Sequence, residues 1–335
     1  MIKERILFLD VAKALCIILV VVGHYVPAYS PDWYMGLHDV IYTFHMPLFM
    51  FASGYIYMAT RKETDYGSFL MRKVRRLLVP YLTVSVLIIS IKLVMQGDAY
   101  VENPVSAMSY VRMFYLPEAG YFLWFIWALW WMFVLVPLCK TRNARCLLWV
   151  ASVVLKCLPV QFPELFCLEQ FKNMFVFFMT GVLVCESRAA HAFVSQCKWA
   201  QAFVAVCLFA VVEKLHFSEN LVWGGENTLL SFILPFIGIL FILELSKWLV
   251  RIFRMREKGG ALLQVSMASY LIYLLHTTFE GFVKAIVQRL PVVDHGLWYV
   301  FIPEVVVVIS CGVIVPMWLS CVFKRYRLTR WMFGL

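Results

Sequence analysis

The first long apolar stretch of the chain, from Ile6 to Tyr25, contains three side chains that can carry charge: Asp10, Lys13 and His24. Ionisable groups inside a membrane span are costly and mark candidate functional sites. Lys13 and His24 are eleven residues apart, which in a helix is about three turns, or roughly 16 Å, with both side chains on nearly the same face. The spacing predicts one polar stripe that joins a cation near one membrane surface to an imidazole near the other.

Each member of this stripe has a structural and a chemical interpretation. Asp10 and Lys13 are spaced to form an ion pair on one helix face, which either neutralises itself or acts on a substrate. His24 can act as a general base, although a single histidine at a helix end more often packs at the interface. His45 is predicted to return to the same outer side as His24, with His38 beside it. The spacing of these histidines is not diagnostic of a metal site, and we expect no metal.

A cluster of cations follows the second apolar stretch and contains Arg72, Lys73, Arg75 and Arg76. Arginine grips phosphate oxygens through its planar fork, so Arg72, Arg75 and Arg76 are candidates to bind the phosphates of a donor that arrives from the cytoplasm. The alternative is an orientation signal or a contact with anionic lipids. Taken alone, the cluster does not decide between them.

Further polar groups lie within later apolar stretches. His276, Glu280 and Lys284 are spaced four residues apart and form one helical stripe, with His276 as either a hydrogen-bonded strut or part of a substrate cavity. Glu304 is predicted to be buried, and no pairing partner is evident for it. Trp124 more often packs in a bundle than offers an aromatic platform to a ligand.

The elements that must position these residues are membrane helices. Hydrophobic residues make up 63% of the 335-residue chain and charged residues 15%, and the mean hydropathy is +0.80, values that belong to polytopic membrane proteins. The N-terminal stretch is interpreted as a first span and not as a signal peptide, because it contains Asp10 and Lys13 and is followed by Pro27, Pro31 and Trp33. We expect an all-α bundle and one integral domain over residues 1–335, without an appended soluble domain. Ten spans are predicted, at about 6–26, 38–58, 74–95, 121–138, 146–160, 171–185, 199–214, 228–249, 262–288 and 297–322.

The loops between the predicted spans alternate in charge. Cations occupy every second loop and the tail: Arg61, Lys62, the Arg72–Arg76 cluster, Lys140, Arg142, Arg145, Arg188, Lys198, Lys247, Arg251, Arg254, Arg256, Lys258, Lys324, Arg325, Arg327 and Arg330. Acidic residues occupy the others: Asp98, Glu102, Glu118, Glu164, Glu169, Glu219, Glu226 and Asp294. Because cytoplasmic loops are rich in Lys and Arg, both termini are predicted to be cytoplasmic. The net charge of +10 then reflects topology, and no nucleic-acid partner is expected.

The ten cysteines are scattered through the chain without metal-ligand spacing or a redox Cys-x-x-Cys motif. Most are expected to be small apolar fillers. Cys157 and Cys167 are both predicted near the outer surface, and whether they form a disulfide is left open.

The order of several short motifs resembles the membrane acyltransferase-3 family. Lys13 and His24, within a segment that begins Leu9-Asp10-Val11-Ala12-Lys13, resemble the family's basic residue, ten-residue gap and histidine. The other matching pieces are Phe44-His45-Met46-Pro47-Leu48-Phe49 leading to Ser53-Gly54-Tyr55, Arg72-x-x-Arg75 leading to Pro80-Tyr81, Leu123-Trp124-Phe125, Phe177-Phe178-Met179-Thr180-Gly181, and Ser269-Tyr270-Leu271-Ile272-Tyr273-Leu274-Leu275-His276. Together they cover nearly the whole chain and are most similar to the branch of fucose O-acetylase-like and exopolysaccharide acyltransferases.

The resemblance implies transfer of an acyl group, usually acetyl from acetyl-CoA, to a hydroxyl of a cell-surface glycan or its lipid-linked precursor in the bacterial inner membrane. It implies catalytic roles for His24, Lys13 and Asp10, phosphate binding by the arginines, and substrate contacts by His45, His276 and Trp124. The chain departs from the family in having Lys13 where many members have Arg, and Tyr121-Phe122 where a histidine often precedes Leu-Trp-Phe. Membrane lipids are expected partners, and a homo-oligomer is left open.

Two other function classes fit the same residues. A transporter or flippase would use the buried His, Lys and Asp as a proton or substrate path, although no internal repeat is visible. A membrane scaffold or sensor would need no chemistry. An assay of acyl-CoA-dependent transfer distinguishes an enzyme from a transporter or flippase. A measurement of acetyl-CoA binding distinguishes an enzyme from a scaffold or sensor.

Overall fold

A computed structural model of the chain describes residues 6–96, 103–223, 228–253, 260–287, 289 and 294–335, with the backbone alone given for 216–223, 228, 229 and 231. All regular structure in these residues is helical, as predicted. The predicted loop charges Asp98, Glu102, Glu226, Arg254, Arg256 and Lys258 lie outside the described residues, as does the side chain of Glu219. The described cysteines are free thiols, and these include Cys157 and Cys167.

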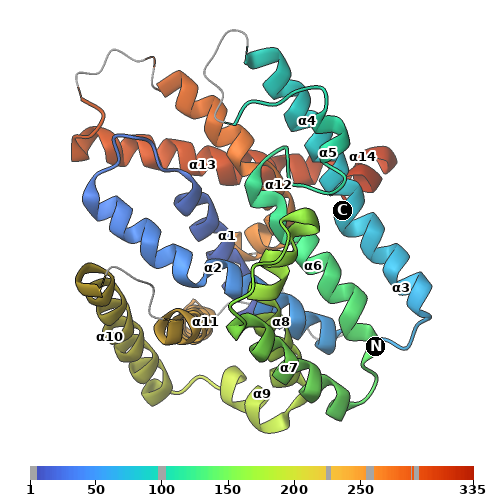
Figure 1. Cartoon of the computed structure of the whole chain (residues 1–335). Coiled ribbons are helices and arrows are strands. Elements are labelled where there is room, and N and C mark those ends of the chain that lie inside the picture. Colours follow the sequence, from blue (N-terminus) through green and yellow to red (C-terminus); the bar gives the residue numbers. More distant parts are fainter. Residues whose placement is uncertain (1–5, 97–102, 224–227, 254–259, 288, 290–293) are drawn as a thin grey trace. The chain divides into compact units, whose positions relative to one another are not determined.

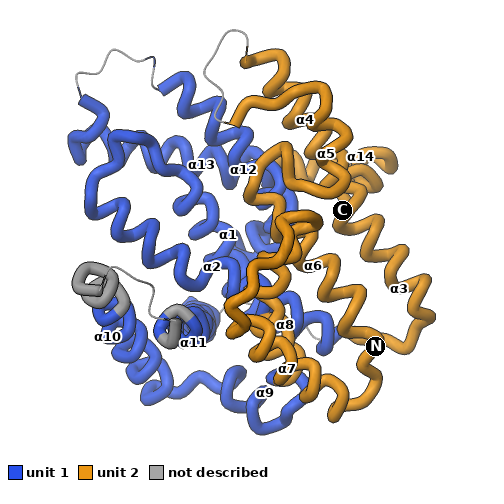
Figure 2. Tube along the Cα trace, viewed as in Figure 1, with its two compact units in different colours: residues 1–60, 184–317 blue, residues 61–183, 318–335 orange. Residues whose placement is uncertain are grey.

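The chain divides into two compact units, shown in different colours in Figure 2. Unit 1 comprises residues 1–60 and 184–317, and unit 2 comprises residues 61–183 and 318–335. The helices centred in unit 1 are labelled in Figure 1: α1 (Leu7–His24), α2 (Asp32–Ala59), α9 (Arg188–Ser195), α10 (Trp199–Trp223), α11 (Thr228–Ile252), α12 (Ala261–Val287) and α13 (Trp298–Phe323). Those of unit 2 are α3 (Tyr66–Lys73), a π-helical turn (Val74–Leu78), α4 (Val79–Met95), α5 (Ser109–Arg112), α6 (Trp124–Leu135), α7 (Arg142–Cys157), α8 (Leu168–Glu186), α14 (Arg327–Met332) and short 3₁₀ turns at Tyr121–Leu123, Val136–Leu138 and Leu165–Cys167.

Unit 1 is built around α1, which packs against α2, α11 and α12. Small side chains on α1, such as Ala12, Ala14 and Cys16, are fully buried. Small residues allow helices to approach closely in a membrane, where packing and interhelical hydrogen bonds replace the hydrophobic effect as the driving force. One such bond joins α1 to α2, because the Cys16 thiol donates to the backbone carbonyl of His45 at 3.0 Å. The residues of the predicted stripe therefore lie on the central helix of this unit.

Seven helical segments in the described residues are long and apolar enough to cross a membrane: Leu7–His24, Tyr66–Met95, Tyr121–Leu138, Leu165–Glu186, Phe232–Ile252, Ala261–Val287 and Trp298–Phe323. These confirm seven of the ten predicted spans. Arg188–Ser195 and Trp199–Leu215 form an eighth candidate if this pair, bent by 84°, is one broken span. Helices also occupy the two remaining predicted positions. However, α7 has only 16 residues, and α2 carries polar residues such as Asp39 and His45, so neither meets the same criteria.

Candidate active site

The ion pair predicted on α1 is present. The ammonium of Lys13 lies 2.9 Å from Oδ1 of Asp10, and both side chains are mostly buried, at 23% and 14% exposure. The same carboxylate oxygen accepts a hydrogen bond of 3.2 Å from the hydroxyl of Ser266 on α12. Asp10 thus holds Lys13 and also fastens the first half of α1 to α12.

The imidazoles of His24 and His276 lie together at the other end of α1. Their ring centroids are 5.0 Å apart and the rings are tilted by 53°. His24 is half-buried, whereas His276 is completely buried. The structure therefore brings the histidine predicted as catalytic against the histidine predicted to contact substrate, although the chain separates them by more than two hundred residues.

The backbone determines the tautomer of His276. Its Nδ1 lies 3.0 Å from the carbonyl oxygen of Ile272 and 2.8 Å from that of Tyr273. A carbonyl oxygen can only accept a hydrogen bond, so Nδ1 must carry the hydrogen, and the neutral ring keeps its lone pair on Nε2. His276 therefore offers a fixed hydrogen-bond acceptor within the histidine cluster.

His45 follows the same pattern on α2. Its Nδ1 donates to the carbonyl oxygen of Ile41 at 2.8 Å, and the side chain is buried. The ring of Tyr42 connects the histidines, with its centroid 6.2 Å from that of His24, 4.7 Å from that of His45 and 4.1 Å from that of His38. We call His24, His38, His45 and His276 the histidine cluster. Among the described residues, no group of His, Cys, Asp and Glu is arranged to hold a metal ion.

Glu280 lies one turn beyond His276 on α12 and is also buried, at 4% exposure. It also lies against Gly312 of α13, where a Cβ atom would be 3.1 Å from Oε1 of Glu280. The stripe predicted on α12 thus points its first two members inward, whereas Lys284 is only half-buried.

Glu304 is buried as predicted, but the expectation that nothing pairs with it is wrong. Its Oε1 accepts hydrogen bonds from the hydroxyls of Tyr25 and Tyr29. Its Oε2 lies 3.0 Å from Nδ1 of His295. These partners lie in the loops that precede α2 and α13. Loops have no helical periodicity, so the spacing of these residues in the sequence could not predict the contacts.

The arginines of the basic cluster belong to unit 2. Arg72 lies in the last turn of α3, and Arg75 and Arg76 lie in the π-helical turn that joins α3 to α4, a feature common at functional sites. All three are exposed, and the guanidinium of Arg72 donates to the hydroxyl of Thr64 at 2.9 Å. The neighbouring Lys73 instead lies over the Phe133 ring, 3.5 Å from its centroid.

Trp124, also in unit 2, is half-buried at the start of α6, with its ring packed edge-on to that of Phe125. The arginines and Trp124 thus belong to unit 2, whereas the histidine cluster belongs to unit 1.

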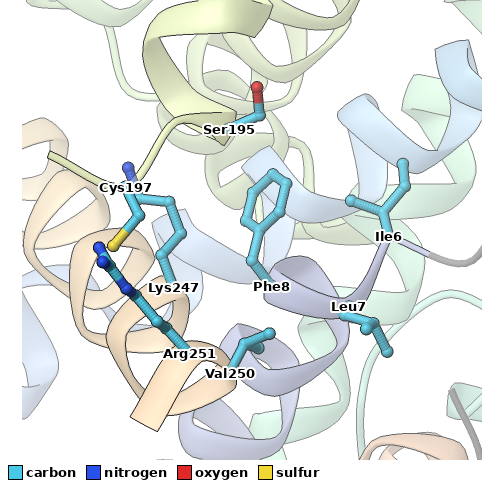
Figure 3. Close-up of a pocket in the computed structure, with 8 residues that line it drawn as sticks. All are labelled: Ile6, Leu7, Phe8, Ser195, Cys197, Lys247, Val250 and Arg251. Carbon is cyan, nitrogen blue, oxygen red and sulfur yellow. The ribbon is translucent and has the colours of Figure 1, made fainter. Parts of the chain in front are cut away.

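A hollow of about 380 Å³ opens at the first turn of α1. Figure 3 shows Phe8 on one side and the charged ends of Lys247 and Arg251 on the side of Cys197. The ammonium of Lys247 is paired with the carboxylate of Glu244 at 2.6 Å. None of the residues predicted for the site lines this hollow, so it is separate from the histidine cluster.

The comparison with protein families decides the classification. Residues 6–321 match the acyltransferase-3 family of acyltransferase domains. The chain belongs to this family. The match includes most of each unit and every residue predicted for the site, and it confirms the resemblance seen in the motifs.

Two curated relatives are similar to part of the chain. The nodulation protein NolL of Mesorhizobium japonicum is 30% identical over 155 residues, which are 45% of this chain and 40% of that protein. NolL of Sinorhizobium fredii is 28% identical over 192 residues, or 55% of this chain and 50% of that protein. The chain thus aligns with half or less of each relative. No solved structure matches the chain.

Proposed function

We propose that the protein is an O-acyltransferase that moves an acyl group, acetyl being the first choice, from acyl-CoA to a hydroxyl of a cell-surface glycan or its lipid-linked precursor. Membership of the acyltransferase-3 family supports the reaction class. The observation that carries the assignment of the site is the contact between His24 and His276, 5.0 Å apart, on a helix that also holds the Asp10–Lys13 pair.

In the proposed reaction His24 is the general base. A sugar hydroxyl is a weak nucleophile at neutral pH, and removal of its proton by a neutral imidazole contributes about 10²–10⁴-fold. The hydroxyl oxygen attacks the thioester carbon, the carbon–sulfur bond breaks, and CoA leaves as a thiolate that takes the proton back from His24. In the covalent alternative, His24 attacks the thioester carbon, the carbon–sulfur bond breaks and CoA leaves as a thiolate. The acceptor hydroxyl then attacks the acyl-imidazole, the carbon–nitrogen bond breaks, and the hydroxyl proton passes to the CoA thiolate. Both routes begin with the same neutral ring.

The lone pair that the backbone fixes on Nε2 of His276 suits it to bind the acceptor beside His24. A hydroxyl that donates to His276 or His45 would be held while a neighbouring hydroxyl meets His24. We assign Trp124 to the acceptor as well, as an aromatic platform. Orientation of this kind is a main source of rate in group transfer.

The donor side of the reaction is assigned to the cations. Lys13, held by Asp10 at 2.9 Å, would stabilise negative charge on the thioester oxygen or on a phosphate of CoA. The exposed Arg72, Arg75 and Arg76 would bind the CoA phosphates from the cytoplasm. The thin pantetheine arm would carry the thioester toward His24 while the nucleotide stays outside the bilayer. The protein would then work in the bacterial inner membrane, with lipids around it and no nucleic-acid partner.

The test is transfer of radiolabelled acetyl from acetyl-CoA by the purified protein, with membrane glycolipids and fucose-terminated oligosaccharides as acceptors. We expect His24→Ala to lose at least 100-fold in rate. His191→Ala is the matched control, because this histidine lies on α9 and contacts Tyr55 instead of the cluster. If His24→Ala transferred acetyl as fast as the control, His24 would be neither base nor acyl carrier. Proton-coupled transport without any acyl transfer would favour a transporter.

A further inference from the structure

One carboxylate, that of Glu304 on α13, gathers three partners that come before two different helices. The hydroxyls of Tyr25 and Tyr29 both donate to its Oε1, and Nδ1 of His295 lies 3.0 Å from its Oε2. The rings of Tyr29 and His295 also pack together, with centroids 5.2 Å apart. The Glu304 side chain is only 2% exposed. We call these four residues the Glu304 cluster.

This cluster holds the chain immediately after the proposed catalytic residue. His24 is the last residue of α1, and Tyr25 is the position where the backbone leaves the helix. The last carbonyl groups of a helix have no partners within it, so helix ends fray unless other groups hold them. Here the hydroxyl of Tyr34 donates to the carbonyl oxygen of Val22 at 2.8 Å, and the side chain of Tyr25 is fastened to Glu304.

We infer that Glu304 is a positioning residue for His24: through Tyr25 and Tyr29 it fixes the end of α1 and so holds the His24 imidazole against His276. The inference rests on the proposed role of His24. A helix end that moves by about 1 Å can cost about 100-fold in rate even when the substrate still binds. The burial of Glu304 fits this role, because a carboxylate with three partners in a dry environment makes strong hydrogen bonds.

Two other roles for the cluster make different predictions. A purely structural cluster would lower the thermal stability when broken but would leave kcat of the folded protein unchanged. If the cluster bound the sugar, breaking it would raise KM for the acceptor. If the cluster positions His24, breaking it lowers kcat while KM for acetyl-CoA stays the same.

The experiment compares four variants of the full-length protein in detergent. Glu304→Ala removes both acceptor oxygens, and we expect kcat to fall about 30–100-fold, within the loss that misplacement of a catalytic group produces. Glu304→Gln keeps one amide oxygen for both tyrosines and should restore kcat to within about fivefold of wild type. Tyr25→Phe removes a single bond and should fall between them. Tyr299→Phe is the matched control, because this tyrosine on the first turn of α13 is 57% exposed.

A readout independent of transfer separates this inference from the proposed function. Carbethoxylation of His24 by diethyl pyrocarbonate, followed by mass spectrometry, should be several times faster in Glu304→Ala and Tyr25→Phe than in Tyr299→Phe. The wild-type protein could transfer no acetyl while His24 is still modified faster in Glu304→Ala and Tyr25→Phe than in Tyr299→Phe. That result would support the positioning role of Glu304 and overturn only the enzyme proposal.

The inference is overturned if Tyr25→Phe keeps both the wild-type kcat and the wild-type modification rate. It is also overturned if Glu304→Gln loses as much kcat as Glu304→Ala, or if KM for the acceptor rises at constant kcat. Should Glu304→Ala not fold, Glu304→Gln and Tyr25→Phe decide the matter.

Discussion

Two amide substitutions at His276 test which of its ring nitrogens matters to the reaction. The amide nitrogen of Asn reaches the place of Nδ1, and the amide oxygen of Gln reaches the place of Nε2. Nδ1 donates to the carbonyl oxygens of Ile272 and Tyr273, whereas Nε2 is the acceptor that we assign to the substrate hydroxyl. His276→Asn therefore keeps the strut to the backbone, and His276→Gln keeps the acceptor.

The size of the effect follows from the burial of the ring. A neutral hydrogen bond is worth about 0.5–1.5 kcal/mol, and a buried polar group left without its partner costs about 1–3 kcal/mol. His276 has 0% exposure, so water cannot replace the lost acceptor. With about 1.4 kcal/mol for each tenfold change, His276→Asn should lose roughly 10–100-fold in kcat/KM for the acceptor. His276→Gln should stay within roughly threefold of wild type.

The assay is acetyl transfer at varied acceptor concentration and saturating acetyl-CoA, with the melting temperature of each variant measured in the same detergent. If His276 serves only as a strut through Nδ1, the two variants should rank in the opposite order: His276→Asn would be stable and active, and His276→Gln would be unstable. Full activity of His276→Asn would refute the acceptor role of Nε2. Equal loss in both variants, with unchanged melting temperatures, would also refute it.

Three further substitutions probe the surroundings of the histidine cluster. Gly312→Ala would place a Cβ 3.0 Å from Cγ1 of Val21 and 3.1 Å from Oε1 of Glu280. Thermal unfolding should therefore show a loss of about 1–3 kcal/mol in the free energy of unfolding. Gly281→Ala is the control and should lose no stability, because its Cβ would have nothing within 4 Å. Lys13→Met removes the ammonium that lies 2.9 Å from the mostly buried Asp10 carboxylate and should destabilise the protein by about 3 kcal/mol, partly recovered in the Asp10→Asn/Lys13→Met double variant. Equal stability of the single and double variants would show that the ion pair contributes nothing to stability. Arg75→Ala should raise KM for acetyl-CoA about tenfold with little change in kcat, and Arg325→Ala, in the tail, serves as the control for a general loss of positive charge.

The helices and the Asp10–Lys13 ion pair of the site could be predicted from the sequence because they depend on local spacing. Long apolar stretches predict spans wherever the bilayer is the solvent, and the i, i+3 spacing of Asp10 and Lys13 predicts an ion pair that the structure confirms at 2.9 Å. Family membership was also accessible, since the order of the motifs from Lys13 to His276 carries it.

The contacts between distant segments could not be predicted in this way. The meeting of His24 with His276 depends on how α1 packs against α12. The partners of Glu304 are more hidden still, because Tyr25, Tyr29 and His295 lie in loops where periodicity carries no information. The roles of the arginines and of Trp124 stay predictions, because these residues belong to a different unit from the histidines.

The contacts within unit 1 also constrain the topology. Along α1 and α2 the contacts run in opposite order: His24 meets Tyr42, Cys16 meets His45, and Phe8 meets Tyr55. Since α2 runs antiparallel to α1 over nearly its full length, it crosses the membrane with α1 despite its polar residues. Along α1 and α12 the order is the same, with Asp10 at Ser266 and His24 at His276, so these two helices are parallel.

Parallel helices in a membrane require an odd number of crossings between them. Among the described residues, four segments between α1 and α12 meet the length and apolarity criteria: Tyr66–Met95, Tyr121–Leu138, Leu165–Glu186 and Phe232–Ile252. With α2 they become five, which satisfies the requirement. It remains satisfied only if α7 and the bent α9–α10 pair both cross or neither does. With α13 after α12, the total within the described residues is eight or ten. An even total places the start of α1 and the end of α13 on the same side of the membrane, as the loop charges predict.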